Sequence, residues 1–124
     1  QELGVSFCYV RSSAKGHGLT NLVEGVVEKG QSVVIIEDLI STGSSSLKAF
    51  KALKEEGLDI KGMAAIFTYG FEISEENFKA AKCDLITLTD YSTLLEKGVE
   101  NNYISDSDVK SLNEWRENPS EWNN

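Results

Sequence analysis

An almost continuous apolar run, residues 32–36 (SVVII), constrains the fold of this chain more than any other feature. Strands that are covered on both faces carry such runs, whereas strands with one solvated face alternate apolar and polar residues. Further along, a helical stripe passes through Leu47, Phe50 and Leu53, and Gly57 is well placed to end that helix. A buried strand followed by a helix is the repeating unit of a parallel sheet.

The alternation of strand and helix continues along the rest of the chain. Ser74 and Asp90 are each expected to cap a helix that follows a strand. The other expected elements are strands at residues 5–10, 22–27, 62–69 and 84–89 and a last helix from about residue 105 to just before Pro119. The sequence therefore predicts an α/β fold, with a parallel sheet and helices on both of its faces.

Size, charge and cysteine content exclude several classes of function. The 124 residues suffice for one domain, and the formal net charge of −8 argues against a nucleic-acid partner. Cys8 and Cys83 belong to no CxxC pair, and His17 is too distant in sequence to complete a metal site, so both cysteines are expected to be small core residues. No apolar stretch approaches the roughly 18 residues of a membrane span. We therefore expect a cytoplasmic, reducing compartment and no membrane partner.

Two adjacent acids and a turn of small residues follow the apolar run. Glu37 and Asp38 are expected at the carboxyl end of a buried strand, where ligands bind in open α/β sheets. Carboxylates there can accept hydrogen bonds from vicinal ribose hydroxyls. The small residues 41–45 can line an anion site with their backbone N–H groups at a helix start. Together these groups suit a ribose 5-phosphate, although a capped helix after a solvated loop would leave the same pattern.

The stretch VVIIEDLISTGSS (residues 33–45) resembles the phosphoribosyl pyrophosphate (PRPP) signature of the type I phosphoribosyltransferases. The resemblance implies the fold of that family and a PRPP site. It implies that Glu37 and Asp38 hold the ribose 2′ and 3′ hydroxyls, with Asp38 also catalytic. The remaining residues that it assigns to PRPP binding are Leu39, Ile40, Ser41, Thr42, Gly43, Ser44 and Ser45.

The loop at residues 11–21 (RSSAKGHGLTN) resembles the flexible catalytic loop of the orotate phosphoribosyltransferases. The resemblance implies that Arg11, Lys15 and His17 bind PRPP, that Lys15 and His17 are catalytic, and that the loop reaches the active site of the partner in a homodimer. Cations suit this task, because pyrophosphate leaves with several negative charges. Mg²⁺ is expected on the pyrophosphate oxygens, with no direct protein ligand. Taken alone, the loop would pass for a solvated surface turn.

The implied activity is the transfer of ribose 5-phosphate from PRPP to orotate, giving orotidine 5′-phosphate and pyrophosphate in de novo pyrimidine (UMP) biosynthesis. The chain departs from some family members, which carry a cation where Ser12 stands and an Arg for the orotate carboxylate within the stretch that is 66–71 here. Ser41 and backbone groups are therefore expected to hold orotate.

The resemblance covers roughly residues 3–104 and only the later part of a complete enzyme. Residues 1–124 are thus expected to be the C-terminal portion of a phosphoribosyltransferase core, inactive by itself. Three alternatives remain: a non-catalytic PRPP-binding regulator on the same fold, another type I phosphoribosyltransferase, and a phospho-acceptor receiver domain. The loop cations disfavour the first, and the phosphate-type turn after Glu37 and Asp38 disfavours the last.

Overall fold

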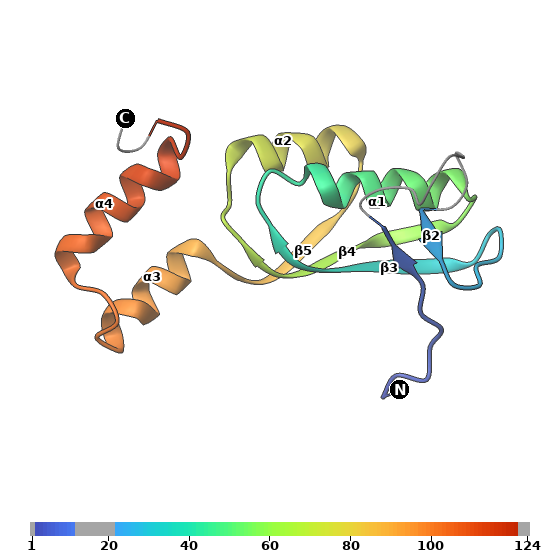
Figure 1. Ribbon diagram of the computed structural model, residues 1–124, viewed down its shortest axis with the longest axis horizontal. Coiled ribbons are helices and arrows are strands. Elements are labelled where there is room, and N and C mark those ends of the chain that lie inside the picture. Colours follow the sequence, from blue (N-terminus) through green and yellow to red (C-terminus); the bar gives the residue numbers. More distant parts are fainter. Residues whose placement is uncertain (1, 12–21, 122–124) are drawn as a thin grey trace.

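The computed structural model describes residues 2–11 and 22–121 (Figure 1). Its elements in chain order are β1 (Tyr9–Val10), β2 (Val23–Glu24), β3 (Ser32–Ile40), α1 (Ser44–Glu55), β4 (Asp59–Thr68), α2 (Glu72–Ala81), β5 (Leu85–Asp90), α3 (Tyr91–Glu100) and α4 (Asp106–Glu117). Strands β3, β4 and β5 form a three-stranded parallel sheet in that order. The α/β fold with a parallel sheet is therefore confirmed.

Helices α1 and α2 cover one face of this sheet and enclose the core with it (Figure 1). Ile35 and Met63 from the sheet meet Leu47, Phe50 and Leu53 from α1, all of them buried. The helical stripe predicted from the sequence thus faces the sheet as expected. Gly57 follows α1 with a φ of +81°, a conformation that suits glycine at the residue after a helix.

The opposite face of the sheet has no helix over it in the described part of the chain (Figure 1). Its apolar side chains are exposed: Val34 by 56%, Ile36 by 70%, Ile66 by 55%, Ile86 by 70% and Leu88 by 81%. The expectation of helices on both faces is therefore met on one face only within this chain. The reason is topological. Both crossovers, β3–α1–β4 and β4–α2–β5, advance in one direction across the sheet, and right-handed crossovers then place both helices on the same side.

The two short strands β1 and β2 form a separate antiparallel pair, with Tyr9 opposite Glu24 and Val10 opposite Val23. The strand expected at residues 5–10 is therefore reduced to its last two residues. The side chain of Phe7 is 82% exposed and lies outside the pair. Val23 is buried in the core cluster, and this contact joins the pair to the body of the molecule.

The ends of the helices follow from local hydrogen bonds. The Asp90 carboxylate accepts from the Thr93 N–H at 2.8 Å and caps α3 as predicted, and this bond lowers the pKa of Asp90. The cap predicted at Ser74 is wrong, because α2 begins at Glu72 and the Ser74 N–H already donates to the Phe71 carbonyl. The last helix runs from Asp106 to Glu117, as expected. None of the described helices is long and apolar enough to cross a membrane.

Candidate functional site

Glu37 and Asp38 lie within β3, whereas the sequence places them directly after the end of that strand. The strand continues to Ile40, and Glu37 pairs with Ala65 of β4. Successive residues of a strand point to opposite faces, so the two carboxylates leave the sheet on different sides. Glu37 is half-buried and Asp38 is exposed. Among the described residues, neither carboxylate has a hydrogen bond or ion pair, so both are free to accept from a ligand.

The turn at residues 41–45 joins β3 to α1 at the carboxyl edge of the sheet. Gly43 is buried and has φ +78° and ψ 0°, in the left-handed region, and Ser44 begins the right-handed helix. Successive residues of opposite hand turn their backbone N–H groups towards one point, which favours an anion. The Thr42 and Ser44 hydroxyl oxygens lie 3.0 Å apart beside these groups. The turn thus has a backbone that can accept an anion, and its binding of a phosphate stays a prediction.

Helix α2 supports this turn from behind through two successive residues. The Asn77 side-chain amide donates to the Thr42 carbonyl oxygen at 3.0 Å. The ring of Phe78 lies so close to Gly43 that a Cβ there would be 2.6 Å from Phe78 Cε2. Glycine is therefore required at position 43 both by its backbone conformation and by this contact. Neither Asn77 nor Phe78 carries a signal in the sequence that points to this role.

The loop cations predicted to bind PRPP are only partly within the described residues. Lys15 and His17 lie outside them. Arg11 is described: its backbone N–H donates to the Leu22 carbonyl, and its Nε contacts the Glu24 carboxylate at 2.5 Å. The polar partners of Arg11 in the described part of the chain are thus Leu22, directly before β2, and Glu24 of β2, and not the turn at residues 41–45.

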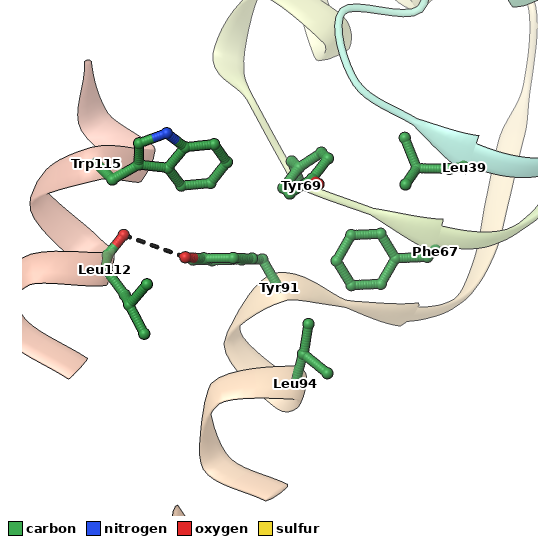
Figure 2. Close-up of a pocket in the computed structure, with 7 residues that line it drawn as sticks. All are labelled: Leu39, Phe67, Tyr69, Tyr91, Leu94, Leu112 and Trp115. Atoms are coloured by element: carbon green, nitrogen blue, oxygen red, sulfur yellow. Dashed lines mark hydrogen bonds between the residues drawn. The ribbon is translucent and has the colours of Figure 1, made fainter. Parts of the chain in front are cut away.

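A pocket of about 480 Å³ opens beside the same edge of the sheet (Figure 2). Leu39, one of the predicted PRPP-binding residues, lines it from β3. Four aromatic rings form most of the rest: Phe67, Tyr69, Tyr91 and Trp115. Burial raises the pKa of the Tyr91 phenol, and the neighbouring Tyr69 has a smaller effect in the same direction. The Tyr91 hydroxyl donates to the Leu112 carbonyl at 3.3 Å. The described residues that line the pocket are apolar or aromatic, and none of them is a cation that could bind a carboxylate.

The turn after β4, where some relatives were expected to carry an Arg, instead receives one from α4. Arg116 donates through Nε to the Tyr69 carbonyl at 2.8 Å and through Nη2 to the Gly70 carbonyl at 3.0 Å. These bonds hold α4 against the turn. In the described part of the chain, no group of three or more His, Cys, Asp or Glu side chains is arranged to hold a metal ion.

Comparison with known proteins identifies relatives of the whole chain, although no protein-family model matches it. The chain is 51% identical over 120 residues to the orotate phosphoribosyltransferase of Cytophaga hutchinsonii, a match that covers 97% of this chain and 57% of that protein. The chain thus spans a little over half the length of the curated relatives that it matches, as the resemblance to part of an enzyme predicts.

Solved structures agree with this match. The orotate phosphoribosyltransferase of Aeropyrum pernix superposes with a TM-score of 0.64 at 32% identity, over 73% of this chain and 50% of that one. The Mycobacterium tuberculosis enzyme, solved in complex with PRPP, superposes with a TM-score of 0.56 at 28% identity, over 67% of this chain and 46% of that one. At 51% identity over 97% of its length, this chain is thus similar to part of an orotate phosphoribosyltransferase, and its fold resembles that of a solved enzyme of the same name.

Proposed function

We propose that the full-length protein transfers ribose 5-phosphate from PRPP to orotate, releasing pyrophosphate and forming orotidine 5′-phosphate. One observation carries the proposal. Two carboxylates without a partner among the described residues stand on β3 directly before a left-handed glycine turn at the start of α1. This order brings acceptors for sugar hydroxyls next to donors for a phosphate. The curated relatives that the chain matches are named orotate phosphoribosyltransferases, which supports the same assignment.

In this proposal the residues divide the substrate between them. Glu37 and Asp38 accept hydrogen bonds from the ribose 2′ and 3′ hydroxyls, which requires the ribose to lie at the carboxyl edge of β3, where one ligand can meet side chains from both faces. The 5′-phosphate lies against the N–H groups of residues 43–45 and the Thr42 hydroxyl, where the positive end of the α1 dipole favours an anion. Ser41, half-buried between β3 and the turn, is the proposed side-chain contact to orotate.

Arg11, Lys15 and His17 are proposed to stabilise the pyrophosphate as it leaves, with Lys15 and His17 as catalytic residues. Mg²⁺ held by the pyrophosphate oxygens would neutralise part of the same charge. We further propose a homodimer in which this loop serves the partner's site. The contacts of Arg11 with β2 support that arrangement, because they direct its guanidinium to the β1–β2 pair and not to the turn of its own chain. The free thiols of Cys8 and Cys83 suit the proposed cytoplasmic location.

The test is orotate consumption by the full-length protein with PRPP and Mg²⁺, measured as the loss of orotate absorbance. We expect turnover with orotate and none with adenine or hypoxanthine. Binding of PRPP without turnover of any base would instead indicate a non-catalytic regulator on this fold. Turnover with a purine alone would indicate another type I phosphoribosyltransferase.

A further inference from the structure

The contact between α2 and the turn after β3 joins two segments 35 residues apart, through the Asn77 amide and the Thr42 carbonyl oxygen at 3.0 Å. Asn77 lies inside α2, between the helix ends at Glu72 and Ala81, and is half-buried. The next residue, Phe78, is 4% exposed and belongs to the core cluster. The amide is therefore presented by a helix whose position is set by the core, which makes it a firm support.

This hydrogen bond fixes the orientation of one peptide group. In a trans peptide the C=O and the following N–H point in opposite directions, and the described chain has no cis peptide bond. With the Thr42 carbonyl held towards α2, the Gly43 N–H is turned away from α2, to the open side of the turn. Gly43 N–H has no acceptor among the residues that the structure describes. It is thus left available for an anion, as an oriented donor.

We propose that Asn77 is a positioning residue for the 5′-phosphate of the substrate, an inference that rests on the proposed function. Asn77 touches no substrate atom. It prevents the Thr42–Gly43 peptide from turning over, which would replace a donor at the phosphate by a carbonyl oxygen that repels it. Gly43 makes such a rotation accessible, because glycine adopts positive and negative φ about equally well. Because the turn itself does not fix the orientation of this peptide group, another residue is needed to hold it.

The test is Asn77→Ala in the full-length protein, with calorimetric titration of ribose 5-phosphate, PRPP, pyrophosphate and orotate. We expect ribose 5-phosphate and PRPP to bind about fivefold more weakly, the effect of one net hydrogen bond. Pyrophosphate and orotate, which do not reach the cradle, should bind as before. The better helix propensity of alanine offsets the stability lost with the hydrogen bond, so the melting temperature should change little and weaker binding cannot be assigned to unfolding.

Asn101→Ala is the matched control. Its side-chain amide also donates to a backbone carbonyl, that of Lys97 at 2.8 Å, but at the end of α3 and outside the turn. It should leave all four affinities unchanged. Asn77→Asp, which keeps the size and replaces the donor by an acceptor, should weaken ribose 5-phosphate binding at least as much as Asn77→Ala.

The outcomes separate this inference from the proposed function. Unchanged ribose 5-phosphate affinity in Asn77→Ala, with normal binding by the unmutated protein, would overturn the positioning role alone. An equal loss for all four ligands would also overturn it, since that indicates a general disturbance. Failure of the unmutated protein to bind PRPP would instead remove the proposed function.

Discussion

Phe78 Cε2 occupies the place where a side chain on Gly43 would begin, 2.6 Å from the position of a Cβ. Gly43→Ala should therefore cost about 1–2 kcal/mol for the left-handed backbone and a further ~1–3 kcal/mol for overpacking. Gly30→Ala separates the two effects, because Gly30 has φ +84° and no atom within 4 Å of its Cβ position. Denaturant unfolding of the full-length variants should show the larger loss at position 43. Equal losses of unfolding free energy at positions 43 and 30 would mean that the Phe78 ring moves away from the added methyl group at little cost.

Removing the two negative charges on β3 should abolish tight PRPP binding. In the full-length protein, Glu37→Gln with Asp38→Asn replaces charge-assisted hydrogen bonds to the ribose, each contributing on the order of 1.5–3 kcal/mol. Calorimetry with PRPP should show the loss. The adjacent acids Glu55 and Glu56 at the far end of α1, changed to Gln together, provide the control and should have no effect. Normal affinity in the β3 double variant would end the assignment of these residues to ribose.

Lys15→Ala should lower kcat far more than it raises KM, because the proposed role of Lys15 is to stabilise charge that develops on the leaving group. Steady-state kinetics with varied PRPP would measure both. Mixing Lys15→Ala subunits with Asp38→Asn subunits should restore one working site per heterodimer if the loop serves the partner's site. If activity is not restored although mass spectrometry verifies subunit exchange, the loop serves the site of its own chain.

The exposed apolar face of the sheet predicts the behaviour of the 124-residue chain alone. Val34, Ile36, Ile66, Ile86 and Leu88 expose apolar side chains on one face of three adjacent strands, and exposed apolar surface drives association. The chain alone should self-associate in light scattering and consume no orotate. Ile86→Lys with Leu88→Lys should reduce the association. Turnover by the chain alone at the rate of the full-length protein would show that the site is complete within these residues.

Cys83 should react slowly with thiol reagents. Its side chain is buried, and desolvation, with a smaller effect of Asp84, raises the pKa of its thiol. At any given pH less of the reactive thiolate is present, so the labelling rate of a Cys8→Ser variant should still rise with pH above the ordinary thiol range of about 8.5. Because the folded-state pKa is raised, this group favours folding below that range and the benefit is lost as pH rises. A rate equal to that of the unfolded chain would contradict the burial.

The sequence predicted the parallel sheet and its helices from apolar periodicity, which reports burial directly. It ended the third strand at Ile36 because two carboxylates follow, but backbone pairing with β4 continues regardless of side-chain charge. It placed a helix cap at Ser74 because a serine hydroxyl often caps a helix. The first turn of α2 begins earlier, where the Phe71 carbonyl accepts from the Ser74 N–H. Asn77 carries no local signal at all: its role depends on Thr42, and a contact across 35 residues leaves no trace in periodicity.

Helix α4 has no buried residue, yet it is fixed to the body of the molecule. Arg116 donates hydrogen bonds to two carbonyls of the turn after β4. The Trp115 ring packs near the rings of Tyr69, Phe71 and Tyr91, at centroid distances of 5.4, 6.1 and 5.5 Å. With so few attachments, we expect α4 to be a separate cooperative unit that opens while the sheet stays folded. Its amide hydrogens should then exchange with solvent together, at a lower free energy than those of β4, and each such opening would uncover the aromatic pocket beside the proposed substrate site.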